Sequence, residues 1–463
     1  MDNKIVFLPH ANLQYSQLHP SKRAWVVKES YEKLFDMLFN HPDYKIAFEA
    51  SGITLKIMAE ECPKILTKLK VAIALGKIEP VASPYTHVMM SNIDPALALK
   101  TLKDGLDAWE KYTEIRPVTG WNPECTWTNK MAEIYKEAGF NTLIMDADSL
   151  FLSFDEIRKA TSLSYDVRSH SNKNKLFLIE EYIKDKPEYL RYLTNPSIAE
   201  NGLKLICRSD MMANPMLWFL MGATEGHREK PVSIEEIYSM LDSWKARIEK
   251  SGTFIMPYAE DAEYIGTSAY FYVKQFNEAR FFEPVPSSIE RFNALLNAAI
   301  EKGYELSTPS EVVSSAKEII QNKQLEQIDN GIAWHGGTAK AWANTPYSRI
   351  MDPVCRDLLN GIENINQYLG YSFSEEDAIL KEARIYLTNA YVSDSRWPPA
   401  PTSPGRFNVQ ETIQDLYKTN QLLKEAMMKH NISQVKSLHS YELIDSLIRS
   451  IEDELMSMKY FGE

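Results

Sequence analysis

Residues 118–145 read VTGWNPECTWTNKMAEIYKEAGFNTLIM, and this stretch decides the fold class. It opens on a short strand-like run, continues through an amphipathic segment that ends at a glycine, and closes on a second apolar run. This order predicts a strand, a helix and another strand. Strands joined through a helix pair in parallel, because the crossover returns the chain to the same end of the sheet. The stretch is therefore typical of one unit of a parallel α/β protein.

The same alternation extends over about the first 310 residues. Two of the intervening helices carry clear end signals. Asp94 is a predicted N-cap before Pro95, and Ser233 with Glu236 forms a predicted capping box in a helix that ends at Gly252. Seven strands are predicted, which is close to a closed barrel, at residues 4–8, 45–48, 78–81, 118–121, 142–145, 203–207 and 253–256.

Strand signals fade after about residue 320, and helical spacing takes over. One predicted apolar face consists of Leu443, Ile444, Leu447, Ile448, Ile451 and Leu455. A proline-rich loop at 397–405 divides this part of the chain in two. We expect a barrel domain over 1–318 and a helical domain over 319–463, with helices near 352–370, 374–391, 408–430 and 439–459.

Composition excludes several classes of protein. Of the 463 residues, 44% are hydrophobic and 25% charged, which is typical of globular proteins. The net charge of −12 comes from acids and bases mixed along the chain, which argues against nucleic acid and anionic membranes as partners. Aromatic residues reach 11%, which suits a ligand with flat faces. The oligomeric state is left open.

The four cysteines form no CxxC pair, so neither a zinc knuckle nor a disulfide framework is indicated. No apolar run approaches the roughly 20 residues that span a bilayer. The first residues, MDNKIVFLPHANLQYS, lack the features of a secretory signal. We therefore expect a cytoplasmic protein with no membrane partner.

Polar residues gather where the predicted strands end. Active sites of parallel barrels lie at the carboxyl ends of the strands, so these residues are the first candidates. Taken singly, a histidine in such a place is more often a hydrogen-bonded loop residue, Glu79 before a proline suits a helix cap, and an acidic cluster is usually solvated. If these polar residues were simply exposed to solvent, they would not be expected to occur at the same end of successive strands. They comprise His10; Glu79, Tyr85 and His87; Glu124; and Glu260, Asp261 and Glu263.

Two carboxyl groups across one pocket are what cleavage of a glycosidic bond requires. One attacks or stabilises the anomeric carbon, and the other protonates the departing oxygen. Tyr85, Trp121 and Trp127 would then stack on the apolar faces of sugar rings, whose hydroxyl groups seek polar side chains. The residues thus favour a carbohydrate-active enzyme.

Four motifs carry a specific resemblance: His10, then GKIEPVASPYTH (76–87), then WNPECTW (121–127), then YAEDAEYIG (258–266). In this order they resemble the motifs of glycoside hydrolase family 57, the retaining enzymes that act on α-glucans. The resemblance covers roughly residues 4 to 400. It implies an incomplete (β/α)7 barrel followed by a helical bundle that contributes to the cleft, with no cofactor and no metal.

The resemblance also implies roles for individual residues. The family's nucleophile falls on Glu124, and its general acid/base falls on Asp261. His10, Glu79 and His87 would hold sugar hydroxyl groups near the cleavage point, with Glu263 beside them. The substrate would be starch, glycogen or a maltooligosaccharide.

The chain departs from the family pattern in two places. The first motif is usually His-Gln-Pro, whereas this chain has His10-Ala11-Asn12, so the glutamine contact is absent or comes from Asn12 or Gln14. The fifth motif is only loosely matched in LTNAYVSDSRW (387–397), where Ser393, Asp394 and Trp397 are candidates.

Two further stretches remain open. Trp334 and His335, in WHGGTAKAW (334–342), either line the site or form a structural turn. Arg208 either orients an acid or a hydroxyl group, or forms an ordinary surface salt bridge.

The sequence leaves several functions open. Hydrolysis of an α-amylase type is expected first and 4-α-glucanotransfer second. The sequence alone does not separate them, because the two share a glycosyl-enzyme and differ only in the attacking group. The sequence also leaves open the preference for α-1,4 or α-1,6 linkages, activity on α-galactosides, and endo against exo action. A zinc-dependent mannosidase or deacetylase is a rival on a related barrel, but zinc would need a His-x-Asp pair where Asn12 stands. A carbohydrate-binding barrel without catalysis is a second rival, against which the presence of both Glu124 and Asp261 argues.

Overall fold

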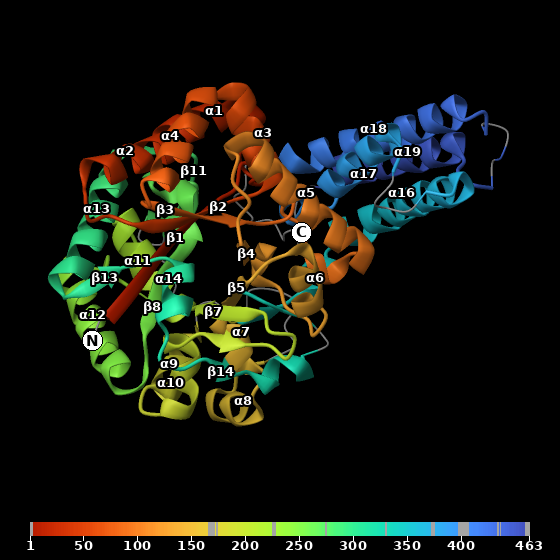
Figure 1. Ribbon diagram of the computed structural model, residues 1–463. Helices are drawn as coiled ribbons and strands as arrows, with labels where there is room; N and C mark the ends of the chain where they lie inside the picture. The colour runs from red at the N-terminus through yellow and green to blue at the C-terminus, as the bar shows by residue number, and fades with distance from the viewer. Residues whose placement is uncertain are drawn as a thin grey trace.

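The computed structural model shows a barrel with a helical bundle projecting from one side (Figure 1). It describes residues 3–164, 172, 175–224, 228–273, 276–328, 331–371, 376–396, 407–432, 435 and 437–458. Within these ranges, the expected incomplete (β/α)7 barrel and the C-terminal helical region are both confirmed.

All seven predicted strands are present and pair in parallel, in the spatial order β8-β1-β2-β3-β4-β5-β7. No ladder joins β7 to β8 in the described part of the chain, so the barrel is open at that seam. The strands are β1 (Asn3–Ala11), β2 (Ile46–Ala50), β3 (Ile78–Ala82), β4 (Thr119–Trp121), β5 (Thr142–Asp146), β7 (Lys204–Arg208) and β8 (Phe254–Asp261).

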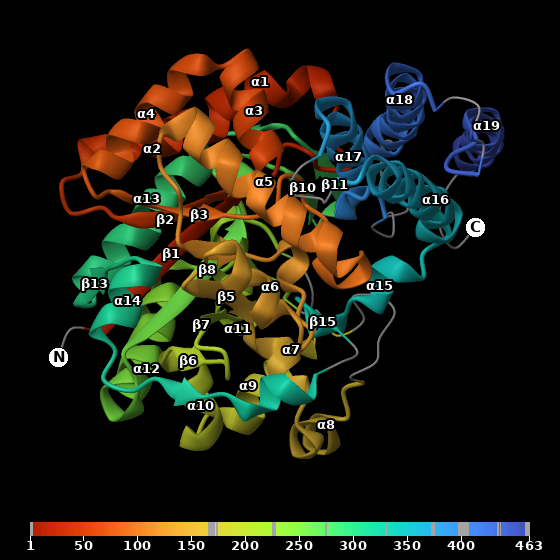
Figure 2. The same ribbon diagram turned by 45° about the vertical axis from the view of Figure 1, so that its right-hand side comes forward.

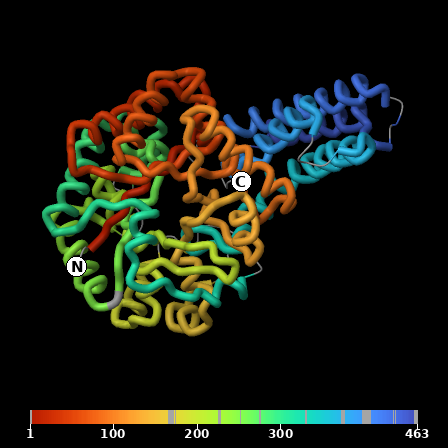
Figure 3. The backbone as a smooth tube through the Cα atoms, in the orientation of Figure 1, coloured from red at the N-terminus to blue at the C-terminus, as the bar shows by residue number. Residues whose placement is uncertain are grey.

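Short strands that the sequence did not indicate extend this sheet. β13 (Tyr304–Leu306) lies beside the first half of β1, and β6 (Ser197–Ile198) and β14 (Ile320–Gln321) follow β7. Because β14 pairs within the barrel sheet, the chain stays with the barrel for some residues after the predicted boundary at 318 before it enters the bundle (Figure 3). That boundary itself stays a prediction.

The barrel interior is filled by side chains that alternate along the strands, as the period of two of a β-strand requires. A buried apolar cluster includes Val6 and Leu8 of β1, Ala47 of β2, Ile144 of β5 and Ile206 of β7. The alternate residues pack outward against the surrounding helices. The next inward position of each strand, toward its carboxyl end, is then available for chemistry.

Helices cover the outside of the barrel, and their predicted ends are confirmed. The carboxylate of Asp94 accepts hydrogen bonds from the first turn of α5 (Pro95–Thr113), and the capping box of Ser233 and Glu236 opens α12 (Ile234–Ser251). The others in the barrel part include α2 (Lys33–Asn40), α3 (Gly52–Glu61), α4 (Pro63–Ala74), α6 (Met131–Ala138), α10 (Pro187–Thr194), α11 (Asp210–Met221), α13 (Pro286–Glu301) and α14 (Pro309–Ser315).

The helical region follows the predicted pattern and packs beside α5 (Figure 2), where its Arg384 pairs with Asp104 of α5. The helical spacing expected near the end of the chain is confirmed by α19 (Tyr441–Ser457); within it Leu443 and Leu447 are exposed, while Ile444, Ile448 and Leu455 face the interior. Among the helices that the structure describes, none combines the length and the apolar character needed to cross a membrane. The bundle helices are α16 (Pro346–Leu369), α17 (Ala378–Ala390), α18 (Phe407–Lys429) and α19 (Tyr441–Ser457).

Candidate active site

A row of polar side chains occupies the carboxyl ends of adjacent strands. The parallel register sets His10 of β1 opposite both Glu49 of β2 and Asp261 of β8. His10 therefore lies inside β1, not after it as the sequence pattern indicated, and Asp261 is the last residue of β8. The three side chains meet because neighbouring strands bring same-register residues to one face.

His10 lies between two carboxyl groups. Its Nδ1 is 2.6 Å from Oε2 of Glu49, and its Nε2 is 3.5 Å from Oδ1 of Asp261. The second oxygen of Glu49 lies 3.5 Å from Nε2 of His87. All four side chains are buried, and Glu49 is completely so.

Burial and charge act in opposite directions on this group. Burial alone would lower the pKa of His10, but the adjacent carboxylate of Glu49 outweighs it and raises the pKa to about 10. Burial would raise the pKa of Glu49, yet the charges of His10 and His87 lower it to about 2. His10 and Glu49 thus form a buried ion pair at neutral pH.

Glu124 stands on an unusual turn that directly follows β4. Glu124 and Cys125 both have positive φ, at 58° and 47°, a left-handed conformation that side chains other than glycine rarely adopt. The turn is held from both sides: the backbone N–H of Cys125 donates to the carbonyl of Asn122, and that of Trp334 donates to the carbonyl of Glu124. Such strain persists only where the surroundings enforce it, and it concentrates at functional sites.

The carboxyl group of Glu124 favours its neutral form. Burial is the main cause, the negative charge of Asp394 adds to it, and together they raise the pKa of Glu124 to about 8. The charge of Asp261 acts in the same direction, while that of His10 opposes it. The pKa of Glu124 thus depends on the charges of Asp394, Asp261 and His10.

Asp261 and Glu263 occupy different surroundings. The hydroxyl group of Tyr15 donates to Oδ2 of Asp261 at 2.8 Å. Glu263 is completely buried and accepts from the backbone N–H of Asn12 at 2.8 Å and from the hydroxyl group of Tyr31. Burial and the charge of Asp261 raise the pKa of Glu263 to about 8. Glu263 supports the loop after β1 from behind, and Asp261 faces His10.

The two tryptophans that bracket Glu124 have separate surroundings. Trp121 stacks on His10 with ring centroids 5.1 Å apart and meets Trp334 edge to face. Trp127 lies in the outer core, where its indole N–H donates to the carbonyl of Leu325. The structure places Trp121 and Trp334 beside the site and does not bring Trp127 to it.

Arg208 is completely buried, so the surface salt bridge that the sequence left open does not apply. Its guanidinium group pairs with Asp146, Asp210 and Glu260, and it lies over the ring of Trp334. Asp210 also meets Nδ1 of His335 at 2.6 Å. Arg208 and His335 therefore belong to an ionic network next to the predicted site.

Two predicted residues lie apart from this cluster. Glu79 belongs to the first half of β3, and its carboxylate accepts from Thr119 and from the backbone N–H of Ser310 in the first turn of α14. The interpretation as a helix cap, weighed from the sequence, therefore describes this residue. Tyr85 packs against α3 at Gly52. Trp397 lies outside the described residues.

Asp394 joins the bundle to the site. Its Oδ2 accepts from the side-chain amide of Asn12 at 2.8 Å, and its Oδ1 accepts from the backbone N–H of Ser16 at 3.2 Å. Asn12 thus holds Asp394 at the place where the family's first motif usually has proline. Sequence reasoning missed Glu49, Tyr15 and Tyr31, none of which belongs to a quoted motif; only the register between strands reveals Glu49.

One trio has the donor types that a transition metal would need. The candidate ligand atoms of His10, Glu49 and His87 lie within 4.8 Å of one another. The 2.6 Å contact between His10 and Glu49 within this trio is also a hydrogen-bonded pair.

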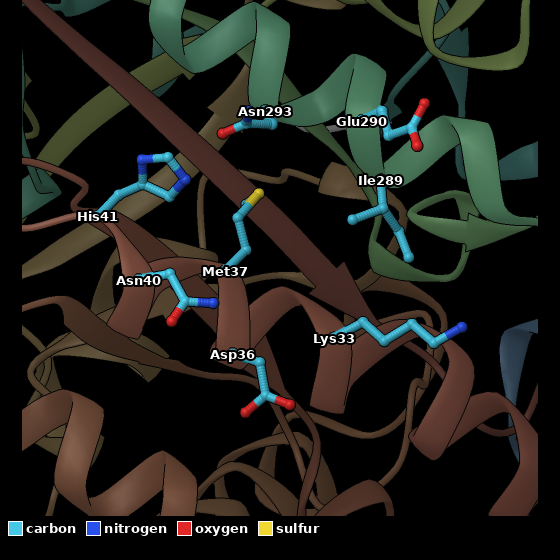
Figure 4. A pocket seen from close by; sticks show the side chains of 8 residues that line it. All are labelled: Lys33, Asp36, Met37, Asn40, His41, Ile289, Glu290 and Asn293. Carbon is cyan, nitrogen blue, oxygen red and sulfur yellow. The ribbon is translucent and has the colours of Figure 1, made fainter.

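A surface cavity of about 360 Å³ lies elsewhere, between α2 and α13 (Figure 4). None of the predicted site residues lines it. Its walls are formed by Lys33, Asp36, Met37, Asn40, His41, Ile289, Glu290 and Asn293.

An open parallel barrel with two carboxyl groups at its strand ends, supported by a helical bundle, defines a barrel of the glycoside hydrolase class. The sequence profile of glycosyl hydrolase family 57 matches residues 1–318, well over half of the chain. The chain belongs to this family.

Individual relatives are distant. The α-amylase of Pyrococcus abyssi is 27% identical over 134 residues, which is 28% of this chain and 20% of that enzyme, so the match spans about a fifth of the curated relative. A branching enzyme from Pyrococcus horikoshii superimposes with a TM-score of 0.64 at 14% identity, covering 97% of this chain and 96% of the other. The α-amylase AmyC from Thermotoga maritima gives 0.59 at 14% identity, covering 96% and 97%. Likeness at this identity shows the fold alone.

Proposed function

We propose that this protein is a retaining α-glycosidase that hydrolyses α-glucans through a glycosyl-enzyme. The observation that carries the proposal is the position of two acids at the carboxyl ends of strands of one barrel. Glu124 lies on the turn that follows β4, and Asp261 is the last residue of β8, where it lies 3.5 Å from His10. The charges of Asp261 and His10 both act on the pKa of Glu124. Membership of the family and its α-amylase relatives support α-glucans as substrates.

In the first half of the reaction, a carboxylate oxygen of Glu124 attacks the anomeric carbon. The bond to the leaving sugar breaks, and its oxygen takes a proton from Asp261. In the second half, Asp261 removes a proton from water, which attacks the same carbon and frees Glu124. Attack by a sugar hydroxyl group in place of water gives transfer to a new chain.

The protonation state of Glu124 sets a condition on these reaction steps. A pKa of about 8 leaves Glu124 mostly protonated at neutral pH, yet attack requires its carboxylate. The positive charge of His10 favours that carboxylate. Because Glu49 holds the proton on His10, His10 is able to act in this way across the neutral pH range.

Incubation with maltoheptaose followed by chromatography tests the proposal. We expect shorter sugars only, and a bell-shaped pH dependence of kcat/KM. Glu124→Gln and Asp261→Asn should each reduce turnover by about 10³-fold or more, because each removes a reacting group and little bulk. Glu133→Gln and Asp107→Asn, at exposed positions, are the matched controls.

Each other outcome has a defined meaning. Longer sugars among the products would show 4-α-glucanotransfer. Near-normal turnover in either carboxyl variant, or a flat profile between pH 4 and pH 8, would contradict the assignment of the two acids. Binding without turnover would favour a non-catalytic carbohydrate-binding barrel. Activity that is lost on chelation and restored by zinc would favour the metal-dependent alternative at His10, Glu49 and His87.

A further inference from the structure

A second, smaller cavity of about 130 Å³ lies where the barrel meets the bundle. The loop after β1 contributes Gln14, and α17 and α18 contribute Asn389, Asn408 and Thr412. Neither Glu124 nor Asp261 lines it. Junctions between structural units are common places for ligand sites.

Among the residues that the structure describes, three of the side chains that line this cavity carry a polar atom with no hydrogen-bond partner. These atoms are Oδ1 of Asn389, Oδ1 of Asn408 and Oγ1 of Thr412. The three side chains are only 9%, 2% and 0% exposed, respectively. Folded proteins rarely leave buried polar atoms unpaired, because such atoms have lost water without gaining a replacement. Three of them around one cavity point to a missing binding partner.

The chemistry of these atoms defines that partner. The side-chain N–H of Asn408 donates to the backbone carbonyl of Gln14 at 3.2 Å, which fixes its amide oxygen as the unpaired atom. Amide oxygens only accept hydrogen bonds, and a threonine hydroxyl group both donates and accepts. The partner must therefore carry several donors and at least one acceptor, as a polyhydroxylated molecule does.

The charges in the wall are already balanced. Arg23 pairs with Glu411 at 2.7 Å, and its Nε–H donates to the carbonyl of Leu13. Asp415, also in the wall, favours its neutral form, because burial and the nearby charge of Glu411 raise its pKa well above the ordinary value. A neutral ligand therefore fits better than a metal cation or an anion.

We propose that this cavity binds one neutral, polyhydroxylated molecule of about the size of a single sugar ring. It exceeds the roughly 30 Å³ that one water molecule occupies in the liquid, and it is smaller than the roughly 300 Å³ at which pockets for larger ligands begin. Hydroxyl groups of the ligand donate to Asn389 and Asn408 and exchange a hydrogen bond with Thr412. We choose glucose as the ligand because breakdown of α-glucans supplies glucose, and this choice rests on the proposed function.

This cavity shares one residue with the surroundings of the active site. The side-chain oxygen of Gln14 accepts from the hydroxyl group of Thr86, which precedes His87 in the chain, and the backbone carbonyl of Gln14 accepts from Asn408. A ligand beside Asn408 therefore lies two hydrogen bonds away from the neighbour of His87.

Crystals of the full chain soaked in D-glucose, and titration of D-glucose followed by NMR, test the inference. We expect glucose density against Asn389, Asn408 and Thr412. Thr412→Val keeps the shape but removes the hydroxyl group, so it should weaken glucose binding roughly two- to tenfold, the contribution of one neutral hydrogen bond. Asn389→Leu should weaken it at least as much.

Matched controls separate binding from folding. Asn366 on α16 also has a buried side-chain amide with no partner in the described part of the chain, but it lies outside this cavity, so Asn366→Leu should leave glucose affinity unchanged. Should the cavity variants misfold, the soaked crystal of the unaltered chain still decides. Ordered water alone, calcium or sodium in place of glucose, or equal affinity in Thr412→Val would overturn the inference.

The outcomes also distinguish this inference from the proposed function. Cleavage of maltoheptaose with a cavity that glucose never enters leaves the function standing and rejects the inference. Glucose in the cavity of a protein that leaves maltoheptaose intact rejects the function and upholds the site.

Discussion

The neutral carboxyl group of Glu124 links the chemistry of the site to the stability of the fold. Its pKa is raised to about 8 in the folded chain, above an unfolded value near 4.5. The folded state therefore binds the proton more tightly, and stability falls as pH rises between these two values. Glu124→Gln removes this penalty. We expect the variant to be more stable than the parent at pH 8, by on the order of 2 kcal/mol, with the difference absent at pH 4.

Urea unfolding at the two pH values measures this difference. Glu133→Gln changes an exposed carboxyl group in the following helix and should show no such dependence on pH. If the difference in free energy of unfolding between the parent and Glu124→Gln is the same at pH 4 and at pH 8, then Glu124 is not held neutral.

The ion pair of Glu49 and His10 stabilises the folded state, whereas the ionisation of Glu124 destabilises it. The raised pKa of His10 gives stability that is full below about 6.5 and is lost as pH rises through 10. The lowered pKa of Glu49 gives stability that is full above about 4.5 and is lost as pH falls through 2. Both contributions are complete between pH 4.5 and pH 6.5.

Glu49→Gln should therefore destabilise the protein at pH 6 by about 3 kcal/mol, since it leaves one member of a buried pair without its partner. It should also let His10 lose its proton near neutral pH, which would shift the pH profile of kcat/KM. Urea unfolding and kinetics measure the two effects. Glu60→Gln, in an exposed pair with Lys56, should change stability by less than about 1 kcal/mol.

Individual residues differ in how far the sequence could reveal them. Glu124 and Asp261 were predictable from motif order, because the carboxyl ends of parallel strands meet at one end of a barrel. Glu49 sits within an apolar strand, FEA, where nothing local marks it, and its role depends on pairing with a strand 39 positions earlier. The left-handed turn at Glu124 and Cys125 is equally hidden, because neither residue favours positive φ.

Among the elements, the seam between β7 and β8 depends most on side chains. No backbone ladder crosses it in the described chain, but Arg208 of β7 reaches Glu260 of β8 while also pairing with Asp146 of β5. The completely buried guanidinium group of Arg208 binds three acids and so connects β8 to the strands on the other side of the seam. The carboxyl end of β8, where Asp261 stands, is thereby fixed.

Arg208→Met should lower the free energy of unfolding by about 3 kcal/mol or more, because it leaves buried acids without their cation. Urea denaturation measures the loss. Arg116→Met removes an exposed arginine that also pairs with two acids, Asp107 and Glu110, and should cost less than about 1 kcal/mol. Equal losses in the two variants would show that the network does not close the seam.

Strand positions were predictable because β-branched runs alternate with amphipathic helices, but their ends were less so. β1 continues to Ala11, three residues beyond the prediction, because Pro9 interrupts the strand-like pattern while the tertiary pairing with β8 and β2 carries on. β6 and β14 are two residues each, too short for any periodicity to register.

For the molecule as a whole, the helical region brings Asp394 to the loop after β1, beside the candidate site of the barrel. The sequence indicated helices there, and the family resemblance singled out Asp394, but only the folded chain shows Asp394 held by Asn12 and Ser16. Contacts between residues nearly 400 positions apart leave no local trace in a sequence. The bundle thereby places a negative charge next to Glu124.

Removing that charge should change the enzyme's response to pH. Asp394→Asn keeps one of the two accepting oxygens, so it retains the hydrogen bond from Asn12 and loses the one from the backbone N–H of Ser16. It also removes the charge that helps to raise the pKa of Glu124. A lower pKa means that Glu124 ionises, and is able to attack, at lower pH. The ascending limb of the kcat/KM profile should therefore move to lower pH by up to about one unit.

Steady-state kinetics between pH 4 and pH 9 measure this shift. Asp357→Asn removes an exposed acid from the same bundle and should leave the profile where it is, which separates a local effect from a change in the bundle's total charge. Urea unfolding of Asp394→Asn checks that the bundle is still docked. If the docked variant keeps the parent's ascending limb, then that limb does not report Glu124, and the nucleophile has to be sought among the other buried carboxyl groups of the strand ends, Glu263 first, because its pKa is also raised to about 8.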